Sequence, residues 1–152
     1  MKRVASIGSL LKKLYRLYSG RLLETLGQKG FTDLRPSFLE VLIFICEHQA
    51  PSIKQIGLGC GLKKQTMTSH LNELEKRGYI KRVTNSSDKR EQLIHLTEYG
   101  EKFKLNLMEA IIDLEKDYVK IIGALELERI EGQLKTFLEK LQSEMSLDHL
   151  KE

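Results

Sequence analysis

The sequence predicts a mainly α-helical protein with one small β-hairpin, organised as a winged helix-turn-helix between N-terminal and C-terminal dimerisation helices. Three observations predict this class. Apolar residues recur at steps of three and four over most of the 152 residues, which is the helical period. A short helix, a turn and a second helix are indicated in the middle of the chain. Directly after them the pattern changes to that of two short strands.

The N-terminal third is predicted to form two helices. The first is amphipathic and ends near Gly27. Its apolar stripe consists of Ile7, Leu10, Leu11, Leu14, Leu17, Tyr18, Leu22 and Leu26. Pro36 suits the first turn of the second helix, because its fixed φ is helical and no N–H is needed there. We expect this helix to end near His48, before a break at Pro51.

The helix-turn-helix follows this break. Ser52 is a good N-cap, because its hydroxyl can accept a hydrogen bond from a free backbone N–H, and we expect a short helix over residues 53–57. The glycine-rich stretch 57–61 is predicted to be a turn. A further helix is predicted from residue 62 to about residue 77, where Gly78 ends it.

The remaining elements are a hairpin and two long helices. Residues 79–83 and 92–96 are predicted strands, and the polar segment 85–90 between them predicts a hairpin tip. Thr97 is expected to cap a long helix, and a last helix begins near Leu127.

These elements predict a winged helix-turn-helix DNA-binding domain over residues 34–97 and a helical dimerisation region formed by residues 1–33 and 98–152. The terminal helices carry more apolar side chains than one small lobe can cover, so we expect a homodimer. The stripes expected between the two chains contain Ile130, Leu134, Phe137 and Leu141, with part of Leu10, Leu14 and Leu17.

Composition narrows the class of protein. Apolar residues make up 41% and charged residues 30%, which fits a globular chain. No apolar run reaches the roughly 18–20 residues of a membrane-spanning helix. Two cysteines make no disulfide framework, so we expect a cytoplasmic protein without a membrane partner. The histidines and cysteines lack paired ligand spacing and no nucleophile–base arrangement is visible, so we expect no metal, no cofactor and no enzymatic activity.

The net charge of +4 is unevenly placed along the chain. Residues 54–104 hold 11 basic and 6 acidic side chains, whereas residues 105–152 hold 6 basic and 11 acidic ones. A polyanion should therefore meet the middle of the chain.

The helix predicted over residues 62–77 carries candidate DNA contacts. A helix fits the major groove of B-DNA, and its N-terminal side chains reach base edges. The candidates are Lys63, Lys64, Gln65, Thr66, Thr68, Ser69 and His70. Lys54 could hold a phosphate, and Ser37 at the start of the second helix joins the candidate set. The alternative interpretation is an ordinary solvated helix face.

The hairpin carries a second group of candidates. Arg82, Lys89 and Arg90 lie on a short ribbon, and an arginine on a protruding wing can enter a narrow minor groove. Asp88, two residues before Arg90, could orient that guanidinium through a charge-assisted pair. The alternative interpretation is a surface ion pair of little energetic value.

At this point the sequence resembles the core of the MarR family of bacterial transcription regulators. The resemblance rests on three motifs in order, LEKRGYI at 74–80, DKR at 88–90 and LTEYG at 96–100, and the similar pattern extends over about residues 34–103. It implies a homodimer that binds a near-palindromic operator, usually as a repressor. It also implies that the recognition helix contacts the major groove and that Arg90 enters the minor groove.

The resemblance further implies release from DNA by a small, often aromatic ligand. Such a ligand would lie near Tyr15, Tyr18, Phe44 and Met108, although these residues also suit a core or a dimer interface. Family members often have Asp or Ser where this chain has Lys63, and commonly Arg where it has Ser69, which suggests a different base preference.

The residues also suit two other functions. One is a winged-helix module that binds protein and does not recognise an operator. The other is a redox-sensing regulator that uses a cysteine, because Lys63 and Lys64 would lower the pKa of the Cys60 thiol if they lay close to it.

Overall fold

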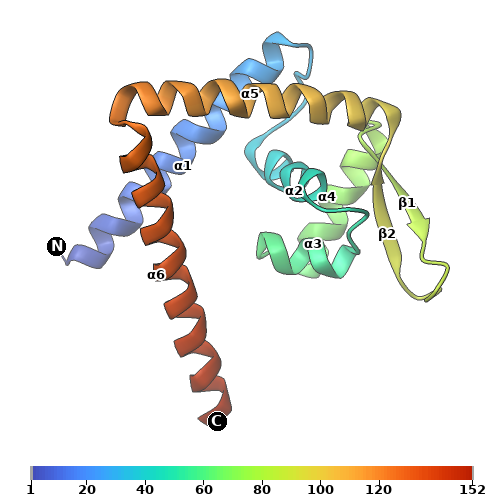
Figure 1. Ribbon diagram of the computed structural model, residues 1–152. Coiled ribbons are helices and arrows are strands. Elements are labelled where there is room, and N and C mark those ends of the chain that lie inside the picture. The colour runs from blue at the N-terminus through green and yellow to red at the C-terminus, as the bar shows by residue number, and fades with distance from the viewer. Residues whose placement is uncertain (1, 152) are drawn as a thin grey trace. The chain divides into compact units, whose positions relative to one another are not determined.

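The computed structural model describes residues 2–151, with side chains described for residues 2–145. The elements in order are α1 (Arg3–Gln28), α2 (Pro36–Glu47), α3 (Ile53–Cys60), α4 (Lys64–Lys76), β1 (Ile80–Thr84), β2 (Gln92–Leu96), α5 (Glu98–Ile122) and α6 (Ala124–Lys151) (Figure 1). The predicted class, mainly α-helical with a hairpin wing, is confirmed. The chain divides into two compact units, Met1–Ile111 and Ile112–Glu152.

The core of the first unit forms around α2. Pro36 occupies the first turn of α2, as predicted, and the helix is apolar enough to be buried on most sides. Its fully buried side chains are Phe38, Leu39, Val41, Leu42 and Ile45. Two neighbouring helices also bury side chains in this core: α1 contributes Leu22 and Leu26 near its end, and α3 contributes Ile56. This burial fixes both helices to the core.

The helix-turn-helix differs from the prediction at the end of α3 and at the start of α4, which begins at Lys64 and not at residue 62. Ser52 caps α3 as expected, because its Oγ accepts a hydrogen bond from the Gln55 N–H at 3.1 Å and the Gln55 side chain accepts one from the Ser52 N–H at 2.8 Å. The predicted end near Gly57 is wrong: α3 continues to Cys60, and only Gly61, with φ of 64°, leaves the helical conformation. Packing of Ile56 in the core outweighs the low helix propensity of the two interior glycines.

The hairpin is fixed to both neighbouring segments. Strands β1 and β2 pair antiparallel with Ile80 opposite Leu96 and Thr84 opposite Gln92. On the other edge of β2, the Ile94 N–H donates to the Pro51 carbonyl at 2.9 Å, so the start of α3 is anchored to the wing. The Thr97 Oγ1 accepts a hydrogen bond from the Gly100 N–H at 3.0 Å, which confirms Thr97 as the cap of α5.

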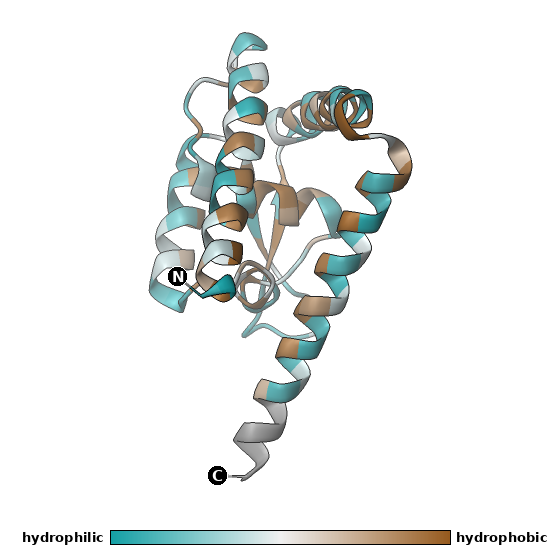
Figure 2. Cartoon of the chain, turned by 90° about the vertical axis from the view of Figure 1, so that its left-hand side faces the viewer, coloured by the Kyte–Doolittle hydropathy of each residue, from teal (hydrophilic) through white to brown (hydrophobic). Residues whose placement is uncertain are grey.

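The second unit contains the end of α5 and all of α6. Apolar residues recur between polar ones along the helix that ends at C (Figure 2). In the described part of α6 they are exposed, and they include Ile130, Leu134, Phe137, Leu138 and Leu141. In the first unit, α1 likewise exposes Leu10, Leu14 and Leu17. Over the described residues, no helix is long and apolar enough to cross a membrane.

Candidate nucleic-acid interface

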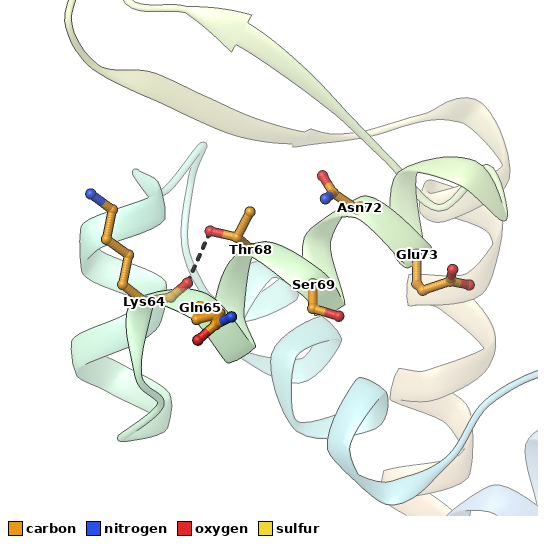
Figure 3. A pocket seen from close by; sticks show the side chains of 6 residues that line it. All are labelled: Lys64, Gln65, Thr68, Ser69, Asn72 and Glu73. Carbon is orange, nitrogen blue, oxygen red and sulfur yellow. Dashed lines mark hydrogen bonds between the residues drawn. The ribbon is translucent and has the colours of Figure 1, made fainter.

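The outer surface of α4 carries a continuous polar face, formed by Lys64, Gln65, Thr68, Ser69, Asn72 and Glu73 (Figure 3). We call these six residues the polar face of α4. They lie three and four positions apart, which places them on one side of the helix. The opposite side is core, because Met67, Leu71 and Leu74 are buried. The face combines a cation, amides, hydroxyls and a carboxylate, which are groups that bond to base edges.

The predicted contacts in the first turn of α4 are all accessible. Lys63 is the N-cap residue and makes no side-chain cap, so the N-terminal N–H groups of the helix lack a capping oxygen from it. Lys63, Lys64, Gln65 and Thr66 are exposed. Thr68 donates its hydroxyl to the Lys64 carbonyl at 2.9 Å and keeps its lone pairs as acceptors.

His70 is placed differently from its predicted neighbours. Its ring packs edge-on against Phe38, with centroids 5.2 Å apart, and its Nδ1 is buried without a hydrogen-bond partner among the described residues. Burial and the nearby Arg35 guanidinium lower the pKa of His70. The structure therefore packs His70 against α2, while Thr68 and Ser69 lie on the polar face of α4.

Basic groups surround the start of α2. The Arg35 guanidinium lies 4.2 Å from the centre of the Phe38 ring, and that of Arg77 lies 4.9 Å from it. Ser37 lies in the first helical turn beside them and is partly exposed. Lys54 is exposed in the first turn of α3.

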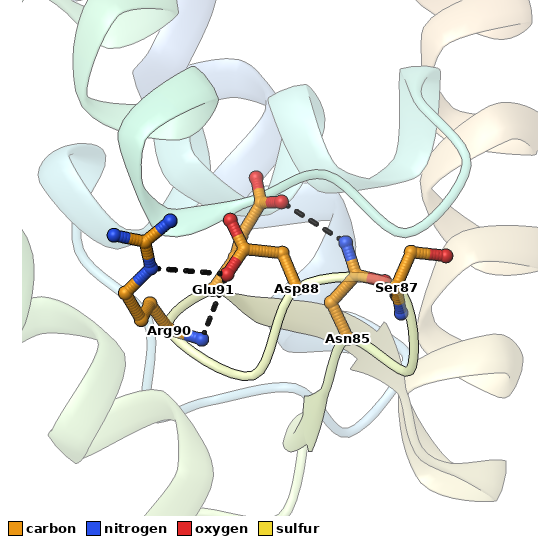
Figure 4. Close-up of polar contacts among 5 residues, drawn as sticks. All are labelled: Asn85, Ser87, Asp88, Arg90 and Glu91. Atoms are coloured by element: carbon orange, nitrogen blue, oxygen red, sulfur yellow. Dashed lines mark hydrogen bonds and ion pairs between the residues drawn. The ribbon is translucent and has the colours of Figure 1, made fainter.

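The wing tip holds the predicted Asp88–Arg90 pair (Figure 4). Asp88 Oδ1 accepts a hydrogen bond from the Arg90 backbone N–H at 3.0 Å and lies 3.4 Å from Arg90 Nε. Asn85 donates to Glu91 Oε2 at 3.0 Å and accepts from the Ser87 N–H at 3.0 Å, which orders the rest of the loop. The Arg90 side chain is 94% exposed, so its terminal nitrogens project into solvent. Lys89 is also exposed.

Arg82 makes contacts within the protein. Its guanidinium donates a hydrogen bond to Asn72 Oδ1, and its Nε lies 3.8 Å from Glu75 Oε2. The side chain is 20% exposed. These contacts join β1 to α4.

Asn72 and Glu73 extend the polar face beyond the residues that the sequence singled out. Asn72 is four positions after Thr68 and seven after Gln65, so helical spacing alone could have identified it. Glu73 lies 3.3 Å from Arg77 Nε, which holds its carboxylate at the end of the face.

The four residues proposed to contact a ligand fall on three helices. Tyr15 and Tyr18 of α1 have ring centroids 6.1 Å apart, and burial, followed by Glu40 and Cys60, raises the pKa of Tyr15. Phe44 of α2 stacks on His48 at 3.9 Å. Met108 lies half-exposed on α5.

Lys63 and Lys64 are not among the groups that determine the pKa of Cys60. Burial, reinforced by Glu40, raises the pKa of the Cys60 thiol to about 11. Burial also raises the pKa of Cys46 to about 11. Both cysteines are free thiols. Among the described residues, no group of three or more histidine, cysteine or acidic side chains is placed to hold a metal ion.

Together, the hairpin and the helix-turn-helix define a winged-helix protein. Residues 32–91 match a sequence family described as the MarR family. The organic hydroperoxide resistance transcriptional regulator of Bacillus subtilis (strain 168) is 30% identical over 109 residues, 70% of each chain. The chain therefore belongs to the MarR family of transcriptional regulators, which are not enzymes.

Solved structures share the fold. A MarR transcriptional regulator from Methanosarcina mazei Go1 superposes with a TM-score of 0.77 at 16% identity, over 91% of this chain and 98% of that one. The S. aureus MepR–DNA complex gives a TM-score of 0.74 at 20% identity, over 89% and 97%.

Proposed function

We propose that the protein is a cytoplasmic, homodimeric repressor that binds a near-palindromic DNA operator. The observation that carries this proposal is the polar face of α4 beside a wing tip whose Arg90 is oriented by Asp88 and 94% exposed. Residues on the helix would contact base edges in the major groove, and Arg90 would enter the adjacent minor groove. Lys54, Lys63, Lys89 and Ser37 would contact phosphates.

Dimerisation would use residues 1–33 and 98–152, leaving residues 34–97 to bind DNA. Exposed apolar side chains on α1 and on the described part of α6 support this assignment, because burying them between two copies is favourable. Two DNA-binding lobes would then meet half-sites about one helical turn apart. Release by a small aromatic ligand near Tyr15, Tyr18, Phe44 and Met108 is a further part of the proposal.

Footprinting on the DNA flanking the protein's own gene tests the function. We expect a protected, near-palindromic site, and a solution mass of twice the 17.5 kDa chain. Repeating the footprint with aromatic ligands tests release. A monomeric mass at micromolar concentration would contradict the homodimer. No protection together with salt-insensitive binding would favour the protein-interaction module instead.

A further inference from the structure

Asn72 lies on the polar face of α4, and a contact within the protein fixes how its carboxamide is turned. The residue is exposed, and it projects from the same side of α4 as Thr68 (Figure 3). Its Oδ1 accepts a hydrogen bond from Nη2 of the Arg82 guanidinium. The side chain is thus open to a partner outside the protein while one of its two polar atoms is bound to the wing.

Arg82 is held in place for this contact. It lies on β1 opposite Ile94, and its side chain is only 20% exposed. Its Nε lies 3.8 Å from Glu75 Oε2, so a carboxylate of α4 also attracts the guanidinium. The direction from which Asn72 receives its hydrogen bond is therefore set before any DNA is bound.

The contact decides which group Asn72 presents outward. A guanidinium carries only donors, so the carboxamide oxygen of Asn72, and not its nitrogen, must face Arg82. The nitrogen lies on the other branch of the same planar group and keeps its two hydrogens. Asn72 is therefore a hydrogen-bond donor toward DNA, whereas a free asparagine offers both a donor and an acceptor.

Base edges in the major groove distinguish these two states of an asparagine. Pairing with adenine uses the oxygen and the nitrogen of the carboxamide together, against N6 and N7 of the base. Asn72 lacks this arrangement because its oxygen is turned to β1. Guanine displays two neighbouring acceptors, O6 and N7, which an NH2 group can bond, while cytosine displays only an amino donor.

We propose that Asn72 is a specificity-determining residue that selects guanine and rejects cytosine at one position of each half-site. Arg82 is its positioning residue, because it holds the carboxamide oxygen away from the base without touching DNA itself. This assignment rests on the proposed function, and it adds the base that one residue of the polar face of α4 recognises.

Asn72→Asp tests the assignment with almost no change of shape. One carboxylate oxygen keeps the Arg82 contact and the other replaces the NH2 group, so the outward donor becomes an acceptor. A carboxylate accepts a hydrogen bond from cytosine N4. Selection from random DNA should show one position of each half-site changing from guanine to cytosine, with the ratio of the two affinities changing by about tenfold or more.

Arg82→Met tests the positioning role. Methionine is long and has no donor, so the Asn72 carboxamide becomes free to turn. We expect adenine to be accepted beside guanine at the position that Asn72→Asp alters. If Arg82 served only to pack the wing, the variant would bind all sequences more weakly and the preference at that position would stay unchanged.

Glu75→Gln is the matched control. It removes the carboxylate that lies near the Arg82 Nε and leaves the hydrogen bond between Arg82 and Asn72 in place. Like Asn72→Asp it exchanges an amide and a carboxylate on α4, but at a residue outside the polar face. The Glu75→Gln protein should keep the wild-type preference for guanine.

Salt-dependent binding of the wild-type protein to DNA is measured first, because it separates the two possible failures. If the wild type binds DNA and Asn72→Asp keeps its preference, the role of Asn72 is refuted and the proposed function stands. A wild type that selects adenine or cytosine at the altered position would also refute that role. A wild type that binds no DNA would refute the proposed function, and the role of Asn72 with it.

Discussion

The guanidinium of Arg82 donates a hydrogen bond to the carboxamide oxygen of Asn72, which links the first strand of the wing to the polar face of α4. The same guanidinium lies 3.8 Å from the Glu75 carboxylate. Asn72 keeps its two amide hydrogens as donors, because only its oxygen is engaged. These two contacts therefore fix the first strand of the wing to α4.

Arg82→Ala should loosen this connection. We expect the free energy of unfolding to fall by about 1 kcal/mol, because a partly buried charged hydrogen bond is lost. Hydrogen exchange should accelerate in β1 and β2. Lys81→Ala is the control, since Lys81 is an exposed neighbour on the same strand. Equal exchange rates in the two variants would contradict the connection.

The two interior glycines of α3 should respond oppositely to alanine. Gly59→Ala would place a Cβ 2.0 Å from the Phe44 ring and should lower stability by about 1–3 kcal/mol through overpacking. Gly57→Ala meets no close contact and should raise stability by up to about 1 kcal/mol through helix propensity. Urea unfolding of both variants measures the contrast. A destabilised Gly57→Ala variant would show that glycine is required there after all.

Cys60 should be unreactive near neutral pH. Its pKa is raised to about 11, so the thiolate is a small minority at pH 7 and grows as the pH rises. Alkylation by iodoacetamide, measured on Cys46→Ala protein, should accelerate by about tenfold per pH unit from pH 7 to 9. A rate that levels off below pH 9 would indicate an activated thiol and revive the redox-sensing alternative.

Gln65→Ala should alter which bases the protein prefers. A glutamine can make two hydrogen bonds to adenine, so its loss should relax selection at one position of each half-site. Lys64→Ala is the contrasting variant, with weaker binding to all sequences and a salt slope smaller by about 1. Selection from random DNA separates these outcomes, and an unchanged preference in Gln65→Ala would remove Gln65 from base recognition.

Much of the fold was predictable because its local signals agree. Helices begin or end at four residues whose types favour helix ends, namely Pro36, Ser52, Gly78 and Thr97. The spacing of apolar residues changes from the helical to the strand period at residue 79, which marks the hairpin. The Asp88–Arg90 pair was predictable because the two residues are close in sequence.

Long-range contacts were not predictable from these signals. The extension of α3 to Cys60 depends on packing against α2, including the Phe44 ring over Gly59. The inward orientation of Arg82 depends on Asn72 and Glu75, which only the fold brings near β1. The raised Cys60 pKa has the same origin, because burial and Glu40 of α2 determine it while the sequence neighbours Lys63 and Lys64 do not.

Arg90 is the residue on which the proposed binding of DNA by α4 and the wing most depends. The most direct test measures the affinity of wild-type and Arg90→Ala protein for the footprinted site over a range of salt concentrations. We predict steep weakening with salt for the wild type, and for Arg90→Ala about tenfold lower affinity, a smaller salt slope and an intact dimer mass. Equal affinity and equal salt slope for the two proteins would contradict a contact between Arg90 and DNA.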